Sequence, residues 1–387
     1  MSDPMSSEAS ATTFSVVEPG QVPRLVELMA AGLREEGARK ADIFNREFWD
    51  WQYRRAPAGP AKVYGAFIKG ELAGYYHVPL YRMMIGGRVG LAGEIQDVAV
   101  RPWAQGRGVF RRLSAFAHAD LESSGVDLLY TFPNSRSVHN LVRAGLRAAG
   151  RSGYKFPNSS SIHTFLKYDK YKKVRELRSW VAPMDSAAIL KMKGGRAASW
   201  LGAAADRALR LTTARVRAGG SLETRRDFTS EVAGLFAPRP GDSSATLVRD
   251  PAYLKWRFFE RPGSNYTVVS YREGGRVTAA AVFKPEPLFG VPALLMMDHA
   301  VLPGKDADMI QLLLRLRDAR QDIFPEHFDL ILAASAPDFA PNPLLAGFLP
   351  IPGPLNPRRI NLLARSFSGD TPAANLWRVR LSDWDVF

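Results

Sequence analysis

The chain has 387 residues, of which 46% are hydrophobic, so it is long enough and apolar enough for two ordinary globular domains. It contains no cysteine, which excludes disulfide bonds, thiolate metal sites and a cysteine nucleophile, and it has no apolar run long enough to cross a membrane. The net charge of +14 favours anionic partners such as a phosphorylated cofactor, acidic lipid or nucleic acid, although a solvated basic surface explains it equally well.

The N-terminal part of the sequence predicts a leader followed by a globular domain. Residues 1–13 lack the basic start and apolar core of a signal peptide, so we expect a disordered leader on a cytoplasmic protein. A strand and a helix are expected over residues 14–29, followed by an aromatic segment at 48–59. Residues 62–74 then alternate around Lys69-Gly70, a dipeptide typical of a tight β-hairpin.

Residues 93–100 predict a strand that carries two carboxylates, Glu94 and Asp97. Strict alternation places Glu94 on one face and Asp97 on the other, whereas a β-bulge would break this parity. An ion pair with a nearby arginine is an equally simple explanation of Glu94.

Residues 97–113 are the most informative segment of the chain. A strand runs into Pro102, Gly106 and Gly108 follow two residues apart, and an arginine-rich amphipathic helix begins at once. The first N–H groups of a helix have no intrahelical partner and favour an anion, and glycines allow a close approach to the backbone. This predicts a diphosphate cradle that is neither a Walker loop nor a dinucleotide fingerprint.

The pattern V-x-V-x-P-x-x-x-G-x-G before a helix resembles the coenzyme A loop of the GNAT acetyltransferase superfamily. The resemblance implies that backbone groups of Val98, Ala99 and Val100 pair with the pantetheine arm. It also implies a diphosphate site made by Gln105, Gly106, Arg107, Gly108, Val109 and Phe110, to which Arg111 and Arg112 add charge. The family usually has Gln or Arg where this chain has Trp103, so one side-chain contact is lost.

The same resemblance implies the catalytic residues. Glu94 stands where several GNAT enzymes place a general base, and Asp97 is its rival. The strand at 127–132 and the residues after it resemble the second coenzyme-binding motif of the family, with Asn134 and Ser137 as contacts. Leu141 occupies the position of the usual thiolate-protonating tyrosine, which leaves Tyr130, His139 or solvent as the acid.

The chain repeats these features once. The aromatic segment around Trp51 matches that around Trp256, a second hairpin turns at Gly274-Gly275, and Asp97 aligns with Asp298. Residues 222–236 likewise repeat the opening strand and helix. The second copy has Asp306 and Asp308 where a diphosphate would rest, so like-charge repulsion predicts that it is degenerate.

The predicted architecture is α+β, with two tandem GNAT-like domains that each have a mixed, mostly antiparallel twisted sheet flanked by helices. We expect a leader at 1–13, an N-terminal domain at 14–167, a basic helical linker at 168–220 and a degenerate C-terminal domain at 221–387. The linker is rich in arginine and predicts a helix that packs on a domain or lies on anionic membrane. The tail at 377–385 is expected to add a strand or cover an edge.

The resemblance implies an acyl-coenzyme A-dependent N-acyltransferase that transfers acetyl from acetyl-CoA by direct attack in a ternary complex. The alternatives are a non-catalytic coenzyme A-binding sensor or scaffold, and acyl transfer to a sugar hydroxyl in cell-envelope polysaccharide metabolism. We expect a small-molecule or sugar amine as the acceptor, no metal, no nucleic-acid partner, and a monomer or homodimer. Peripheral contact with anionic membrane remains open.

Overall fold

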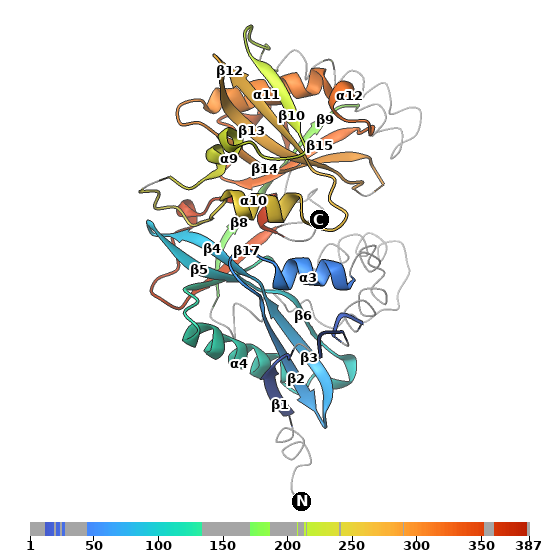
Figure 1. Cartoon of the computed structure of the whole chain (residues 1–387), viewed down its shortest axis with the longest axis vertical. Coiled ribbons are helices and arrows are strands. Elements are labelled where there is room, and N and C mark those ends of the chain that lie inside the picture. The colour runs from blue at the N-terminus through green and yellow to red at the C-terminus, as the bar shows by residue number, and fades with distance from the viewer. Residues whose placement is uncertain are drawn as a thin grey trace, which may run out of the picture. The chain divides into compact units, whose positions relative to one another are not determined.

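The computed structural model describes residues 12–18, 21–23, 25–27, 45–133, 171–185, 207, 213, 215–239, 241–288, 290–351 and 360–384. The chain divides into two compact units (Figure 1). The first unit comprises residues 1–175, 261–263 and 360–374, and the second comprises residues 176–260, 264–359 and 375–387.

The described part of the first unit contains two sheets and several helical segments. One sheet has the order β1-β2-β3-β6 and the other contains β4-β5-β7-β17-β8. The strands are β1 (Thr12–Val16), β2 (Lys62–Ile68), β3 (Glu71–Val78), β4 (Leu80–Ile85), β5 (Arg88–Glu94), β6 (Gln96–Val100), β7 (Leu128–Thr131), β8 (Lys172–Glu176) and β17 (Asn361–Ser366). The helices are α3 (Arg46–Arg54), the 3-10 turn η3 (Pro102–Ala104) and α4 (Val109–Ser123).

Local sequence explains these elements. Asn45 caps α3 because its side chain accepts a hydrogen bond from the backbone N–H of Phe48 at 3.0 Å. The hairpin of β2 and β3 turns at Lys69 and Gly70, whose φ angles of 53° and 80° are both positive, as a type I′ turn requires. This confirms the hairpin predicted at 62–74, and β1 begins at Thr12, inside the predicted leader.

The core of the first unit lies between α4 and the sheets. Leu113 and Ala117 of α4 are fully buried against Tyr76 and Val78 of β3. His118, on the same face, lies between the hydroxyls of Tyr76 and Tyr171 at 3.1 and 3.2 Å. Burial first and the nearby Arg365 second lower the pKa of His118 to about 3, so its neutral ring is part of the core.

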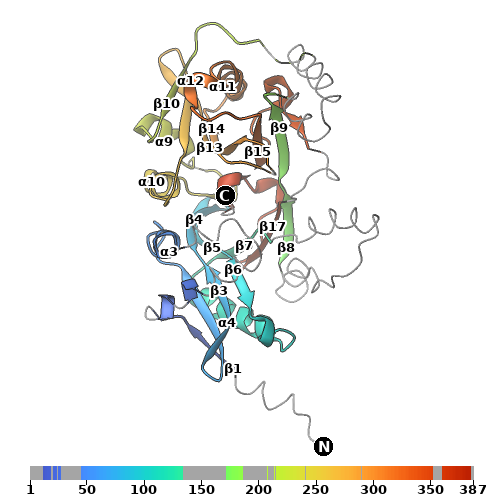
Figure 2. The same cartoon turned by 90° about the vertical axis from the view of Figure 1, so that its right-hand side faces the viewer.

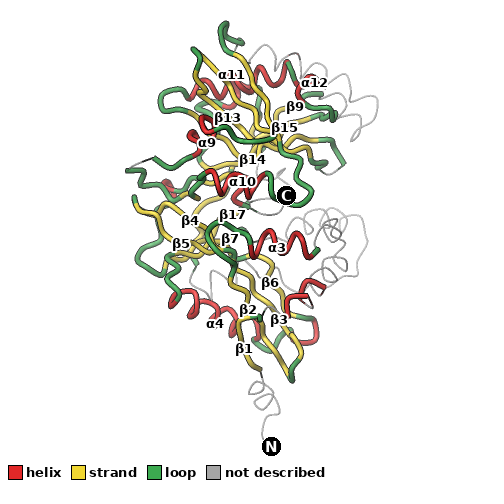
Figure 3. The backbone as a smooth tube through the Cα atoms, in the orientation of Figure 1, coloured by secondary structure: helices red, strands yellow, loops and turns green. Residues whose placement is uncertain are grey.

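The second unit is built on one large sheet with the order β10-β12-β13-β14-β15-β9-β16 (Figure 3). Its strands are β9 (Arg178–Pro183), β10 (Ser221–Arg225), β11 (Thr246–Leu247), β12 (Thr267–Glu273), β13 (Arg276–Pro285), β14 (Ala293–Val301), β15 (Leu330–Ala336), β16 (Leu349–Pro350) and β18 (Val379–Arg380). Its helices are α9 (Ser230–Phe236), α10 (Pro251–Phe258), α11 (Asp306–Asp318), α12 (Arg320–Ile323) and the 3-10 turns η4 (Pro343–Ala346), η6 (Ala374–Leu376) and η7 (Leu381–Asp383).

Two strands pair within units whose other strands are distant in sequence, which the sequence did not predict. β17 comes from the C-terminal part of the chain but pairs with β7 in the first unit, from Leu363 opposite Thr131 to Ser366 opposite Leu128. Conversely, β9 pairs with β15 in the second unit (Figure 2). Residues 360–374 therefore do not belong with a domain that spans 221–387.

The described start of the predicted helical linker at 168–220 is also not helical. It forms β8, at the end of one sheet, and β9, which lies between β15 and β16 of the other sheet, so both strands pair with partners that are distant in sequence. Part of the tail predicted at 377–385 adds a strand as expected, since β18 pairs with the end of β15. In the rest of the predicted linker, residues 186–206, 208–212 and 214 lie outside the described residues.

Candidate functional site

The glycine loop before α4 leaves open space over its backbone. Gly106 and Gly108 have φ angles of 79° and 69°, and a Cβ atom at either position would meet nothing within 4 Å. Gly108 is the N-cap of α4, no side chain caps this helix start, and its first turn contains no acidic residue. The positive end of the helix dipole is therefore not balanced by a carboxylate of its own first turn.

The arginines near the loop are not equivalent. Arg112 is engaged by β1, since its Nη2 donates to Thr12 Oγ1 at 3.0 Å and its guanidinium lies 5.4 Å from the ring centroid of Phe14. Arg107 and Arg111 are exposed. Of the three arginines predicted to add charge at the loop, Arg112 is thus held away by other contacts.

β6 carries Val98, Ala99 and Val100, and it pairs with β3 at the edge of its sheet as far as the described residues show. Such an edge presents backbone groups that can pair with an extended ligand. The Val100 carbonyl already accepts a hydrogen bond from Gln105 Nε2 at 2.9 Å. Val98 and Ala99 therefore offer the more accessible backbone groups.

The side chains of Val109 and Phe110, at the start of α4, pack toward the core. Val109 is 2% exposed and packs in the core beneath the loop, and Phe110 packs against the same core. Neither side chain is directed toward solvent above Gly106 and Gly108. Any contact of Val109 with a ligand above the loop would therefore be made by its backbone.

A β-bulge places Asp97 beside α3. His77 of β3 pairs with Gln96 and Tyr75 pairs with Ala99, so two residues of β6 lie opposite one residue of β3. Asp97 has a φ angle of 46°, and its carboxylate accepts a hydrogen bond from the hydroxyl of Tyr53 on α3. The alternation predicted from sequence fails here, because the extra residue turns Asp97 toward the α3 side.

Glu94 lies at the end of the parallel pairing between β5 and β7. It is 3% exposed, and it is the last residue of the parallel ladder, opposite Tyr130. Ile95 packs in the core with α4, so alternation directs Glu94 to the other face of its strand. Glu94 and Asp97 belong to strands of two different sheets, and Asp97 is the carboxylate with a contact to α3.

A cluster of polar atoms beside α3 was not predicted. Neither ring nitrogen of His77 has a hydrogen-bond partner among the described residues, and the same holds for Trp49 Nε1 and Gln96 Nε2. His77 is fully buried, its ring lies 4.8 Å from that of Tyr53, and burial lowers its pKa to about 3. Buried polar groups rarely lack partners, so this cluster marks room for water or a ligand.

The second coenzyme-binding motif cannot be placed. Asn134, Ser137, His139 and Leu141 lie outside the described residues.

The corresponding part of the second unit differs in charge. Gly304 keeps a positive φ of 72°, but the first turn of α11 carries Asp306 and Asp308, and Asp308 lies 3.6 Å from Arg217. Asp298, the counterpart of Asp97, is fully buried against Arg249 Nε at 2.7 Å. The helix start that is basic in the first unit is therefore acidic in the second.

The described residues contain no group of three or more histidine, aspartate or glutamate side chains placed to hold a metal ion. No helix in the described part of the chain has the length and hydropathy of a membrane span.

One known protein family has a sequence model that matches the part of the chain carrying this site. Residues 15–145 match the sequence model of the family described as acetyltransferase (GNAT) domain. No curated protein sequence matches the chain.

Solved structures with the same fold cover almost the whole chain. A GCN5-related N-acetyltransferase from Anabaena variabilis has a TM-score of 0.57 at 12% identity, covering 92% of this chain and 73% of its own. A probable N-acyltransferase from Enterococcus faecalis has a TM-score of 0.55 at 12% identity, covering 92% and 72%. A tandem GNAT protein from the clavulanic acid biosynthesis pathway has a TM-score of 0.52 at 14% identity, covering 93% and 100%. The predicted α+β fold with two GNAT-like copies is confirmed.

Proposed function

Because residues 15–145 match the model of a GNAT acetyltransferase domain and the chain has the fold of a solved tandem GNAT protein, we propose that it transfers an acetyl group from acetyl-CoA to an amine. The observation that carries this proposal is the open, uncapped start of α4 beside the edge strand β6. Acyl-CoA is the donor used by this family, and the acceptor amine attacks it directly in a ternary complex.

The donor binds along β6 and over the glycine loop. The pantetheine arm pairs with backbone groups of Val98 and Ala99, and the diphosphate rests on the N–H groups at Gly106 to Val109. Arg107 and Arg111 add charge-assisted hydrogen bonds from the exposed side of the loop. This arrangement uses the positive helix end that no residue of the first turn neutralises.

Glu94 acts as the general base. The amine nitrogen attacks the thioester carbonyl carbon, the carbon–sulfur bond breaks, and the amine proton passes to the Glu94 carboxylate. Its burial where β5 and β7 part supports this role. Asp97 is the weaker candidate, because its carboxylate already accepts the Tyr53 hydroxyl, and we assign it to holding the bulge.

Tyr130 is the proposed source of the proton for the departing thiolate. It lies opposite Glu94 in the ladder and is 1% exposed. The usual tyrosine of the family is replaced by Leu141, so solvent is the alternative proton donor.

The absence of that tyrosine also favours a second candidate function, a coenzyme A-binding sensor without turnover. Both candidates predict that acetyl-CoA binds to the first unit. Only the enzyme releases free coenzyme A in the presence of an amine.

The test measures thiol release from acetyl-CoA over a panel of small-molecule and sugar amines. Glu94→Gln should lower kcat by about a hundredfold or more while acetyl-CoA binding is retained, because general base catalysis contributes that much. Glu71→Gln, which changes an exposed glutamate on β3, is the matched control and should match the wild type. An unchanged kcat in Glu94→Gln would remove Glu94 from the mechanism, and binding without turnover on any amine would favour the sensor.

A further inference from the structure

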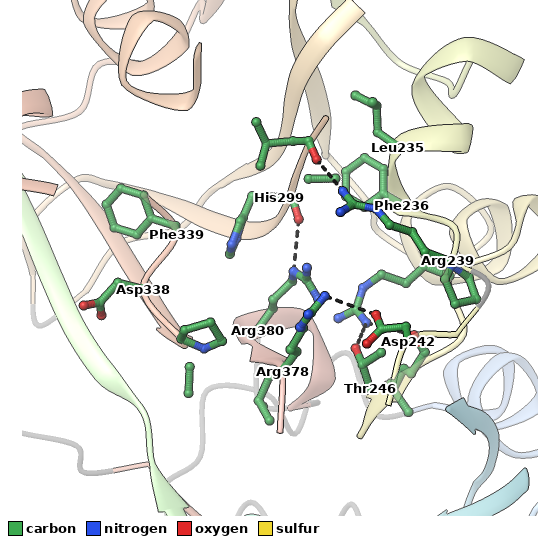
Figure 4. Close-up of a pocket in the computed structure, with 18 of the residues that line it drawn as sticks. Leu235, Phe236, Arg239, Asp242, Thr246, His299, Asp338, Phe339, Arg378 and Arg380 are labelled. Carbon is green, nitrogen blue, oxygen red and sulfur yellow. Dashed lines mark hydrogen bonds and ion pairs between the residues drawn. The ribbon is translucent and has the colours of Figure 1, made fainter. Parts of the chain in front are cut away.

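A cavity of about 550 Å³ lies in the second unit, at the ends of β14 and β15 (Figure 4). The two strands pair in parallel only from Ala293 to Met296, and β14 then continues beside β13 alone. The cavity is bordered by residues 299–301 of β14, by the segment after α9 and by residues 336–341. Its volume is that of a small-molecule site.

The C-terminal segment makes this cavity different from a donor slot. β18 pairs with the end of β15, and Arg380 Nε donates to the backbone carbonyl of His299 at 3.0 Å. His299 is the counterpart of Val98, whose backbone is assigned to pantetheine in the first unit. The chain's own arginine therefore takes the place of a pantetheine contact.

A buried ionic network fixes Arg380 in place. Asp298 lies 3.0 Å from Arg380 Nε and accepts hydrogen bonds from Arg249 Nε at 2.7 Å and from the Ser382 hydroxyl at 2.8 Å. Asp383 pairs with Arg249 and accepts the backbone N–H of Arg380 at 2.9 Å. The guanidinium of Arg380 is thus held rigidly at the cavity wall.

Three guanidinium groups present unused donors to the cavity. Arg239 Nη2 donates to the Val301 carbonyl at 3.0 Å, Arg378 Nη1 donates to Asp242 at 3.1 Å, and Arg380 uses its Nε. Their other side-chain nitrogens make no hydrogen bond within the described part of the chain. Burial, together with the charges of Arg249 and Arg378, lowers the pKa of Arg380 to about 10, and the opposing charges of Asp298 and Asp383 offset part of this effect.

The carboxylates around the cavity have hydrogen-bond or ion-pair partners of their own or lie at a helix start. Asp242 accepts a hydrogen bond from the Ser244 backbone N–H at 2.9 Å in addition to the one from Arg378. Asp338 accepts hydrogen bonds from Arg178 Nη1 and from Trp180 Nε1, each at 2.9 Å. Asp306 begins α11, where the helix dipole stabilises its charge.

From the convergence of Arg239, Arg378 and Arg380 on this cavity, we propose that the second unit binds a small metabolite through an oxyanion, either a carboxylate or a phosphate group. Guanidinium groups bind both through paired N–H···O hydrogen bonds. The rings of Phe236 and Phe339 border the cavity and would contact the apolar body of such a ligand. This site is separate from the donor site proposed for the first unit and does not depend on it.

The test is calorimetric titration of the full chain with inorganic phosphate and, separately, with malonate, at matched ionic strength. Binding of one probe identifies the oxyanion class. Arg239→Ala and Arg378→Ala should each weaken binding by about tenfold or more, because each removes charge-assisted hydrogen bonds. Arg276→Ala, which changes an exposed arginine on β13 outside this cavity, should bind as the wild type does.

A second control separates this cavity from the glycine loop of the first unit. In Gly108→Ala, which weakens the anion site proposed at the glycine loop, the binding of phosphate or malonate that depends on Arg239 and Arg378 should persist with unchanged affinity. The proposal is overturned if the wild type binds neither probe at millimolar concentration, if Arg239→Ala and Arg378→Ala bind as tightly as the wild type, or if Gly108→Ala abolishes binding. Unchanged circular dichroism and thermal unfolding confirm that each variant is folded.

Discussion

Replacement of His77 by phenylalanine should make the first unit more resistant to acid. Burial lowers the pKa of His77 from 6.5 to about 3, so the unfolded chain takes up a proton that the folded chain refuses. The stability due to neutral His77 is therefore fully present above about pH 6.5 and is lost as the pH falls from 6.5 toward 3. Lowering the pH from about 7 to about 5 should therefore reduce the free energy of unfolding of the wild type by about 2 kcal/mol. The His77→Phe variant should not show this reduction.

The substitution itself should cost little at neutral pH. Neither ring nitrogen of His77 makes a hydrogen bond within the described residues, and an aromatic ring preserves the edge contact with Tyr53 at 4.8 Å. Urea unfolding followed by tryptophan fluorescence at the two pH values measures the difference, and NMR titration of the imidazole tests the pKa of His77 directly. A variant that loses stability on acidification in parallel with the wild type would refute the reasoning.

Two further substitutions test the energetics of the second unit. Asp250→Ala removes the helix cap that accepts the Tyr253 N–H at 2.8 Å, so the free energy of unfolding should fall by about 1 kcal/mol; an unchanged urea midpoint would show that the cap contributes nothing. Arg249→Met leaves Asp298 and Asp383 buried beside too little positive charge, so unfolding should become easier by about 3–5 kcal/mol. A neutral or stabilising result in differential scanning calorimetry would contradict this.

Local sequence patterns predicted the backbone geometry of the glycine loop. Gly106 and Gly108 have the positive φ angles and the open surroundings that a strand, a tight turn and a basic helix implied. Such features depend on neighbouring residues only. The hairpin at Lys69 and Gly70 was predictable for the same reason.

Features that depend on distant residues were not predictable. β17 pairs with a strand more than two hundred positions earlier in the chain, and no local pattern encodes that choice. Asp97 lies on the opposite face from the one that alternation predicts, because a bulge adds one residue to β6. Arg239 and Arg380 likewise meet at one cavity only after the second sheet has formed.

No sequence pattern pointed to the buried polar atoms around His77. His77 follows two tyrosines in a strand that reads as ordinary core, and nothing in its sequence context indicates unpaired ring nitrogens. Acceptor pockets are built by segments that vary freely, whereas donor binding uses backbone geometry.

The most direct test of the account is calorimetric titration of acetyl-CoA into the wild type, Gly108→Ala and Gly125→Ala. Gly108 and Gly125 lie at opposite ends of α4, both have a positive φ, and neither has an atom within 4 Å of an added Cβ, so both variants carry similar backbone strain. The account predicts one site in the wild type and in Gly125→Ala, and binding at least about tenfold weaker in Gly108→Ala. Two sites, or equal affinities in the two variants, would contradict it.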